Sequence, residues 1–261
     1  MHPPAPRLLA LENLAVVEYA AFLAAAPFLA FHRDGDDHPV LVLPGFTASD
    51  RSTQPLRAVL ARRGYQVHGW KLGPNVGPHP HILQGLQQRL LSLRQQHGAR
   101  VSVIGWSLGG IYARELARAN PAAIRQVITL GSPFRFRAGD RGAASGLYDA
   151  VGPNADPFPG RMTDEHLRPP LPVPSTSINS RTDGVVRWHA CIDSAGPERE
   201  NVEVIGTHNG LGVNVAALVA ICDRLAQPDG EWAPFRAPLA LRHLYPRPAS
   251  WSRSGEAPQV A

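Results

Sequence analysis

One pentapeptide has the residue types and the spacing of a nucleophilic site. Residues 105–109 read Gly-Trp-Ser-Leu-Gly, so Ser107 stands near two glycines. A serine hydroxyl in this motif can attack a carbonyl carbon when a base takes up its proton. The glycines permit a sharp turn in which a strand and a helix pass too closely for side chains. Residues 101–106 favour a strand and the following segment favours a helix, which is the context that the motif requires.

The partners of the serine decide the interpretation, because a chain with 24 glycines can contain such a pentapeptide by chance. A base must accept the serine proton, and a carboxylate must orient that base. His208 follows a predicted strand and precedes a predicted helix, in the sequence Gly-Thr-His-Asn-Gly. His166, His189 and His243 also come after the serine but lack this context. We therefore predict His208 as the base, with a solvated loop histidine as the alternative.

The acid is expected in a turn after a strand, between the serine and the histidine in chain order. Asp183 meets both conditions, because it follows residues 175–179, a predicted strand. An ordinary Asp-Gly turn is the alternative reading of this position. Three other carboxylates fit less well: Asp164, Asp193, which has no strand before it, and Glu203, which lies inside a predicted strand.

A tetrahedral intermediate also needs two backbone donors for its oxyanion. The N–H of Leu108, directly after the serine, is one candidate. The second is the N–H of Phe46, in the loop Pro44-Gly45-Phe46 that follows the first buried strand. Apolar side chains are expected around the serine, with Trp106 and Val186 as candidate substrate-binding residues. Such surroundings favour a lipid-like or otherwise apolar acyl group.

Six predicted strands alternate with helices and position these residues. The strands are expected at 39–43, 65–70, 101–106, 126–130, 175–179 and 201–205, and the helices at 53–63, 82–97, 108–119 and 211–226. This alternation predicts an α/β fold with a mostly parallel sheet of about six strands and flanking helices. Residues 134–174 interrupt the alternation with a segment rich in Gly, Pro and Arg, which is typical of a lid or cap insertion.

The chain divides into three segments around this core. Residues 1–38 form an apolar N-terminal helical segment, 39–227 the core, and 228–261 a tail. The large apolar residues in the first half of the tail predict that it packs on the core, whereas the part from Ser252 onward is predicted to be disordered.

The apolar stretch at residues 8–31 contains Glu12, Glu18 and Pro27. It is predicted to be an amphipathic helix packed on the domain or over the mouth of the pocket. A helix on a membrane surface and a signal or membrane span are the alternatives. The two glutamates argue against a signal peptide. The expected location is the cytoplasm, with peripheral membrane contact through this stretch as the alternative.

Composition excludes several classes of function. The 261 residues and 44% hydrophobic content fit one soluble α/β domain. The net charge of +5 comes without a basic run, so no nucleic-acid partner is expected. Cys191 and Cys222 have neither metal-ligand spacing nor a disulfide framework, which predicts two buried thiols and no metal site, with pairing in an oxidising compartment as the alternative.

Four motifs together resemble the bacterial serine lipases and carboxylesterases of the α/β-hydrolase superfamily. They are residues 44–46, 105–110, 180–186 and 206–210, and the resemblance covers about 39–227. It implies hydrolysis of carboxylic esters through an acyl-enzyme, without a cofactor. Two features differ from the common pattern: Pro44-Gly45 stands where His-Gly is usual, and the two early strands of the full fold are missing. An acyltransferase or thioesterase, or a non-catalytic lipid- or partner-binding module of the same fold, are the alternatives.

Overall fold

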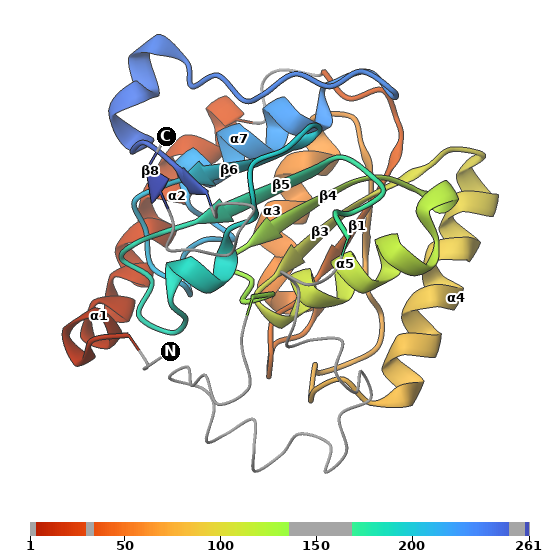
Figure 1. The fold of residues 1–261 in the computed structure, drawn as a ribbon, viewed down its shortest axis with the longest axis horizontal. Helices are drawn as coiled ribbons and strands as arrows, with labels where there is room; N and C mark the ends of the chain where they lie inside the picture. Colours follow the sequence, from red (N-terminus) through yellow and green to blue (C-terminus); the bar gives the residue numbers. More distant parts are fainter. Residues whose placement is uncertain (1–3, 30–33, 136–168, 251–258, 261) are drawn as a thin grey trace.

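Six parallel strands form the central sheet of this protein (Figure 1). The computed structural model describes residues 4–29, 34–135, 169–250 and 259–260. The strand order is β2-β1-β3-β4-β5-β6, so the chain changes direction across the sheet after β2. The strands are β1 (Pro39–Leu43), β2 (Gln66–Gly69), β3 (Val101–Trp106), β4 (Ile124–Leu130), β5 (Ser175–Asn179) and β6 (Arg199–Glu203). In a parallel sheet all carboxyl ends lie at one edge, where ligands usually bind.

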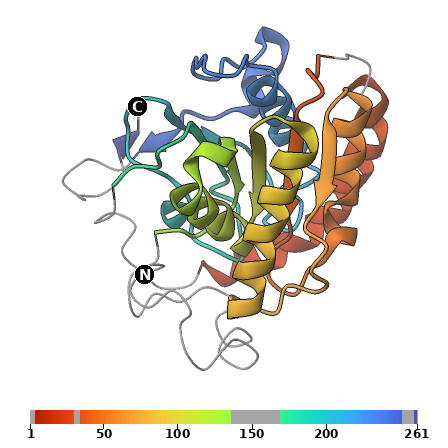
Figure 2. The same cartoon turned by 90° about the vertical axis from the view of Figure 1, so that its right-hand side faces the viewer.

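Helices cover both faces of the sheet (Figures 1 and 2). Side chains alternate between the faces of a strand, and in β1 Val40 and Val42 join one apolar cluster whereas Leu41 and Leu43 join the other. The first cluster includes α3 (Asp50–Arg62) and α7 (Val215–Leu225), and the second includes α4 (Pro80–His97) and α5 (Leu108–Ala119). Short 3-10 turns lie at Pro121–Ala123 and Trp188–Cys191. The predicted α/β architecture is therefore confirmed.

The segment that carries His208 differs from its prediction. β6 begins and ends two residues earlier than expected, and α7 begins at Val215 rather than at residue 211. The residues between them form a loop of successive turns instead of helix. Asn214 ends this loop, because its side chain accepts the Ala217 N–H at 3.0 Å and caps α7. His208 therefore belongs to the loop between β6 and α7 rather than to the residues directly before a helix.

The N-terminal segment consists of α1 (Pro6–Leu11), a 3-10 turn (Glu12–Leu14) and α2 (Ala15–Leu29). α2 packs against α7, and Phe22 is buried in the core cluster of that face. The predicted helix is present and packs on the domain, but it is not amphipathic as expected, because large apolar side chains are exposed on much of the segment while Glu12 faces the domain. Among the described residues, Pro6–Leu29 is the one helical stretch whose length and composition would suffice for a membrane span, with a mean hydropathy of 1.6.

The tail packs in its first half, as predicted. Phe235, Leu244 and Tyr245 contact the core cluster, and the Tyr245 hydroxyl donates to the Ala216 carbonyl at 2.9 Å. A 3-10 helix (Leu239–Leu244) leads to β7 (Ala249–Ser250), which pairs antiparallel with β8 (Gln259–Val260). The predicted disorder from Ser252 was therefore wrong for β8, because these two residues find backbone partners in β7. The central part of the predicted lid, residues 136–168, lies outside the described residues.

Candidate active site

Ser107 occupies the turn between β3 and α5. Its backbone has φ 53° and ψ −121°, a positive φ that residues other than glycine rarely adopt. The Ser107 N–H donates to the Leu130 carbonyl of β4 at 2.8 Å, which holds the turn at the edge of the sheet. Backbone strain of this kind persists only where the surrounding structure enforces it, and it is common at functional sites.

The glycines around Ser107 are required by close backbone contacts. A Cβ on Gly105 would lie 2.3 Å from the Gly109 carbonyl oxygen, and a Cβ on Gly109 would lie 2.5 Å from the Leu43 carbonyl oxygen. A Cβ on Gly110 would lie 1.9 Å from the Ser132 hydroxyl. The motif therefore lets β3, α5 and the end of β1 approach one another more closely than any side chain would allow.

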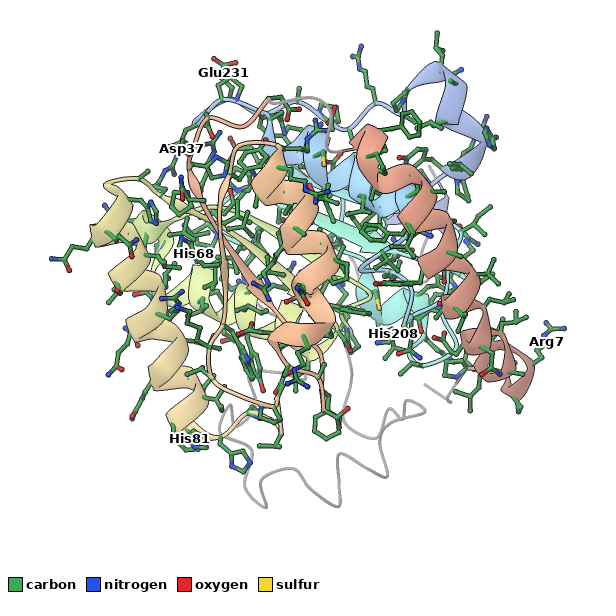
Figure 3. All side chains as sticks on the ribbon, turned by 180° about the vertical axis from the view of Figure 1, so that it is seen from behind. Arg7, Asp37, His68, His81, His208 and Glu231 are labelled. Atoms are coloured by element: carbon green, nitrogen blue, oxygen red, sulfur yellow. The ribbon has the colours of Figure 1, made fainter. Side chains whose placement is uncertain are left out.

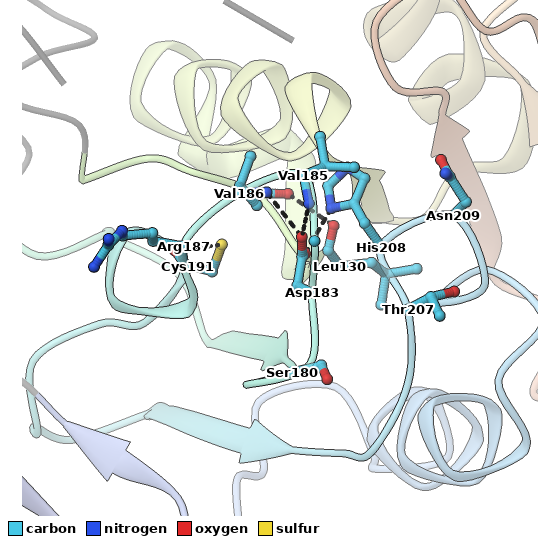
Figure 4. Close-up of polar contacts among 12 residues, drawn as sticks. Leu130, Ser180, Asp183, Val185, Val186, Arg187, Cys191, Thr207, His208 and Asn209 are labelled. Atoms are coloured by element: carbon cyan, nitrogen blue, oxygen red, sulfur yellow. Dashed lines mark hydrogen bonds and ion pairs between the residues drawn. The ribbon is translucent and has the colours of Figure 1, made fainter. Parts of the chain in front are cut away.

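Asp183 and His208 form a buried pair (Figure 4). The Asp183 Oδ2 lies 2.6 Å from the His208 Nδ1, and the other carboxylate oxygen accepts the N–H groups of Val185 and Val186 at 2.9 and 2.8 Å. Both oxygens of Asp183 are thereby engaged. This arrangement orients the imidazole with Nδ1 toward the acid, which leaves Nε2 for chemistry.

The environment of His208 favours its protonated form. Burial alone would lower the pKa of His208, but the Asp183 carboxylate outweighs it through its charge and its hydrogen bond, and the Glu12 carboxylate adds to the effect. The net result is a pKa of His208 above the usual value. An imidazolium formed when the base accepts a proton is stabilised in this position.

Ser107 and the Asp183–His208 pair lie on neighbouring parts of the sheet edge. The strand β4 separates them, and Gly131 directly follows the carbonyl that Ser107 bonds. A Cβ on Gly131 would lie 3.1 Å from His208 Nδ1 and 3.2 Å from Asp183 Oδ2. Among the described residues, no hydrogen bond joins the Ser107 hydroxyl to His208. The structure thus brings the three predicted residues to one edge without a direct serine–histidine bond.

The two predicted oxyanion donors flank the serine. Leu108 is the first residue of α5, where backbone N–H groups have no partner within the helix. The loop with Phe46 passes directly over Ser107, since a Cβ on Gly45 would lie 3.2 Å from the Ser107 Cβ. The Phe46 ring is partly buried against the cluster of α4 and α5.

The two predicted substrate-binding residues have contacts that support the base and the acid. The Trp106 indole N–H donates to the His208 carbonyl at 3.1 Å, and its ring packs beside Gly212. Val186 is buried, and its N–H donates to Asp183. Contact of either side chain with a substrate stays a prediction.

The other candidate acids and bases that the structure describes do not join Ser107, Asp183 and His208. Asp193 is buried, accepts from Arg114 at 2.9 Å and lies 3.4 Å from Arg135, and these two guanidinium groups, against the effect of burial, hold the pKa of its carboxyl below the usual range. Glu203 pairs with Arg181 at 2.9 Å. His189 stacks on the Trp188 ring. Asp164 and His166 lie outside the described residues, and His243 is an exposed residue of the tail.

Asn75 was missed by sequence reasoning and supports the loop with Phe46. Its side-chain amide donates to the Pro44 carbonyl at 2.9 Å, and its backbone carbonyl accepts the Thr47 N–H at 2.7 Å. The Asn75 N–H donates to the Ala48 carbonyl at 2.8 Å. A polar residue in the loop after β2 was the one signal in the sequence, and it did not identify the partners.

Two glutamates of the N-terminal segment were also missed. Glu12 accepts from the backbone N–H groups of Gly184, His208 and Asn209. Glu18 accepts from the Thr207 N–H at 3.1 Å and from the Asn214 side chain at 2.9 Å. Seen from behind, His208 lies beside this segment (Figure 3). The signal was the presence of carboxylates in an apolar stretch, because such groups need polar partners.

Within the part of the chain that the structure describes, no group of three or more His, Cys, Asp or Glu side chains could hold a metal ion. Cys191 and Cys222 are buried and unpaired, which confirms the prediction of two thiols. Burial raises the pKa of Cys222 to about 11.

Comparison with known proteins gives structural neighbours only. No family model and no curated protein matches the sequence. Lipase B from Aspergillus fumigatus has a TM-score of 0.56 at 17% identity, over 76% of this chain and 55% of that protein. A metagenome-derived lipolytic enzyme of the LipS and LipT pair has a TM-score of 0.52 at 20% identity, over 74% and 93%. A mature lipase from Bacillus licheniformis has a TM-score of 0.52 at 16% identity, over 72% and 91%.

These likenesses agree with the predicted fold class and with the resemblance seen in the motifs. At such identities they show the fold alone: the chain has the α/β-hydrolase fold. Its length spans 55% of the Aspergillus lipase and more than nine-tenths of the other two proteins. A fold of this kind supports many chemistries, so the reaction must be argued from the site.

Proposed function

We propose that this chain, which has the α/β-hydrolase fold, is a serine hydrolase of carboxylic esters. The observation that carries the proposal is the strained backbone of Ser107, φ 53°, at the same sheet edge as the buried Asp183–His208 pair. A strained serine, an oriented histidine and a buried carboxylate are the parts that acyl transfer needs. The lipolytic enzymes among the structural neighbours agree with this assignment.

The reaction would proceed through an acyl-enzyme. The Ser107 oxygen attacks the ester carbonyl carbon while His208 accepts the serine proton at Nε2. Asp183 stabilises the imidazolium, and the N–H groups of Phe46 and Leu108 bind the oxyanion. Collapse of the intermediate expels the alcohol, which takes the proton from His208. A water molecule activated by His208 then releases the acid and restores Ser107. The Ser107 hydroxyl and His208 share no hydrogen bond in the described residues, so the reaction would need that bond to form when substrate binds.

An apolar ester is the proposed substrate class. Leu108 and Val186 are buried beside the site, and Phe46 is partly buried. The N-terminal segment exposes a group of large apolar side chains: Leu9, Leu14, Val16, Val17, Leu23 and Phe28. Its two glutamates accept hydrogen bonds from the domain, so this outer surface carries no carboxylate from the described residues 6–29. Such a surface fits contact with a lipid layer that supplies the ester.

The test is hydrolysis of p-nitrophenyl butyrate and palmitate by the wild type and by Ser107→Ala. Loss of the nucleophile should reduce the rate by about 10⁴-fold or more. Ser102→Ala is the matched control, because Ser102 is also in the β3 segment but is fully buried. The control should keep wild-type turnover and should react with a fluorophosphonate, whereas Ser107→Ala should do neither.

Two other outcomes have defined meanings. Labelling of Ser107 without ester hydrolysis would show that the acyl group goes to another acceptor or comes from another donor, as in an acyltransferase or a thioesterase. A wild type that neither hydrolyses esters nor reacts with the probe would reject the proposal in favour of a binding module.

The membrane contact has its own test. Wild type and the variant Val16→Ser/Val17→Ser are mixed with phosphatidylcholine vesicles and separated by flotation. The wild type should float with the vesicles and the variant should do so less. Equal flotation, or none for either protein, would contradict the contact.

A further inference from the structure

We propose that Glu12 is a positioning residue that fixes the loop of Asp183 relative to the loop of His208. The inference rests on the proposed function, because it names Asp183 and His208 as the working pair. Glu12 lies in the N-terminal segment, 196 residues before His208. Its hydrogen bonds within the described residues go to backbone N–H groups and not to an imidazole nitrogen, so it would act through the backbone of the two loops.

The contacts of Glu12 reach both loops at once. Its Oε1 accepts the Gly184 N–H at 2.8 Å and the His208 N–H at 2.9 Å, and its Oε2 accepts the Asn209 N–H at 2.9 Å. Gly184 follows the acid directly in the loop after β5, and His208 belongs to the loop after β6. One oxygen atom thus joins the backbone next to Asp183 to the backbone of His208. Hydrogen bonds to a carboxylate are the stronger kind.

The burial of Glu12 argues against an incidental surface contact. Its side chain belongs to a residue that is 9% exposed, in a segment whose other large side chains are mostly exposed. A buried carboxylate is costly unless several donors surround it. The three N–H groups would likewise be left without this partner if the segment were absent, and buried N–H groups need partners. The carboxylate of the segment and the N–H groups of the loops therefore provide each other with hydrogen-bond partners.

The glycines of the two loops make room for the segment. A Cβ on Gly184 would lie 2.3 Å from the Leu8 carbonyl oxygen. A Cβ on Gly206 would lie 2.6 Å from the Glu18 Oε1, and a Cβ on Gly210 would lie 1.9 Å from the Glu18 Oε2. Gly184 directly follows Asp183, and Gly206 and Gly210 flank His208. The fit of the loops to the segment thus extends beyond the single carboxylate.

Glu12 also acts on His208 through its charge. The charged and titratable groups that face this region are Asp183 from the loop after β5, Glu12 and Glu18 from the N-terminal segment, and the buried Cys191 thiol near Asp183. The negative charge of Glu12 supports the raised pKa of His208, after the larger contribution of Asp183. Removal of that charge should lower the pKa of His208, and the acidic limb of the activity profile should move to lower pH.

The test compares Glu12→Gln, Glu12→Asp and the control Glu18→Gln in the full chain. Glu12→Gln keeps the size of the side chain but places an amide donor against backbone donors. Glu18→Gln removes a carboxylate of the same segment that also bonds the loop of His208. Glu18 is not among the groups that raise the pKa of His208. The readouts are kcat, KM and the pH dependence of kcat/KM with p-nitrophenyl butyrate. Fluorophosphonate labelling counts the active molecules in each sample.

We expect Glu12→Gln to lower kcat per active molecule by about tenfold or more, with a smaller change in KM. Its acidic limb should move to lower pH, while Glu18→Gln should keep the limb of the wild type. Glu12→Asp should restore the position of the limb, because it restores the charge. A Glu12→Gln protein with the kcat and the limb of the wild type would overturn the inference. So would an equal limb shift in Glu18→Gln, since the effect would then come from the packing of the segment.

Failure of the proposed function is distinguishable from failure of this inference. If the wild type neither hydrolyses the ester nor reacts with the fluorophosphonate, the proposed function fails. If the wild type is active and Glu12→Gln matches it, only the positioning role fails. If Glu12→Gln is labelled by the probe but turns over slowly with a shifted limb, both stand.

Discussion

The side chain of Asn75 donates to the carbonyl of Pro44 at 2.9 Å, and both residues are buried. This bond holds the loop that passes over Ser107. Two backbone bonds between Asn75 and residues 47–48 hold the other side of the same loop. The Asn75 Oδ1 accepts the hydroxyl of Tyr112, a residue of α5. Asn75 therefore links the Phe46 loop to the helix that begins next to the serine.

Asn75→Ala should impair the oxyanion site. The Pro44 carbonyl and the Tyr112 hydroxyl would lose a buried partner, which should lower the free energy of unfolding by about 1–3 kcal/mol. We expect kcat to fall by about tenfold to 100-fold because the Phe46 N–H would be less well fixed. Ester kinetics and urea unfolding check the two effects.

Tyr112→Phe is the control for this variant. It removes the hydroxyl that donates to Asn75 and leaves the bond from Asn75 to Pro44 in place. Its kcat should lie closer to that of the wild type than to that of Asn75→Ala. Equal losses of kcat in both variants would show that the Pro44 bond does not position the loop.

Gly105→Ala should prevent correct packing of the turn around Ser107. The added Cβ would lie 2.3 Å from backbone atoms of α5, which cannot move aside as a side chain can. The free energy of unfolding should fall by about 3 kcal/mol, and ester hydrolysis should be lost with it. Thermal unfolding and labelling of Ser107 measure both consequences.

Gly85→Ala is the matched control in a helix. There the nearest atom to an added Cβ is the end of the Leu72 side chain, at 2.9 Å, which can rotate away. Alanine is favoured over glycine within a helix by about 1 kcal/mol. Gly85→Ala should therefore unfold within about 1 kcal/mol of the wild type. A Gly105→Ala protein of wild-type stability would contradict the close contact of β3 with α5.

The pH dependence of hydrolysis should report the Asp183–His208 pair. The base must be neutral to accept a proton, so kcat/KM should rise with pH through the pKa of His208, which lies above the usual value of 6.5. Asp183→Asn removes the largest influence that raises this pKa, so its limb should move to lower pH. Its kcat should fall by about 10⁴-fold. An unchanged limb in Asp183→Asn would contradict the assignment of His208 as the titrating group.

The free energy of unfolding should also depend on the protonation of His208. It should decrease as pH rises, whereas kcat/KM increases. A histidine whose pKa is raised on folding stabilises the folded state fully below the pKa of the unfolded chain. That contribution is lost as pH rises through the pKa of the folded state. His208→Gln should therefore flatten part of the decline in stability above pH 6.5, measured by urea unfolding at a series of pH values.

Sequence reasoning located the sheet and the candidate site for a physical reason. Continuous apolar strands such as 39–43 and glycines at fixed offsets around Ser107 leave local signals. It missed Glu12 and Asn75, because their partners are backbone groups of loops that are distant in sequence or irregular. A backbone N–H is the same for every residue type except proline, so the sequence does not indicate which N–H groups a buried carboxylate or amide will bond. The start of α7 was placed too early for a related reason: the apolar residues Leu211 and Val213 are buried in a loop rather than in a helix.

A second Ser-His-Asp arrangement, at the amino ends of β1 and β3, should have no catalytic role. Ser102 and His38 share a hydrogen bond of 2.9 Å through Nε2, and Asp36 bonds His38 Nδ1. Ser102 is completely buried, so no substrate can reach it. Burial lowers the pKa of His38 despite the bond to Asp36. Burial would by itself raise the pKa of Asp36, but Arg125 and His38 lower it to about 2.

The group of Asp36, His38 and Ser102 should instead stabilise the fold near neutral pH, and this stabilisation should be lost in acid. The folded state binds fewer protons at His38 than the unfolded chain does, so stability should fall as pH drops below 6.5. A further loss should follow between pH 3.8 and about 2, where Asp36 is ionised only in the folded state. His38→Gln should flatten the first decline while leaving ester hydrolysis and the labelling of Ser107 intact. Urea unfolding from pH 8 to pH 5 measures the slope. A variant that kept the slope and lost hydrolysis would assign His38 to the reaction instead.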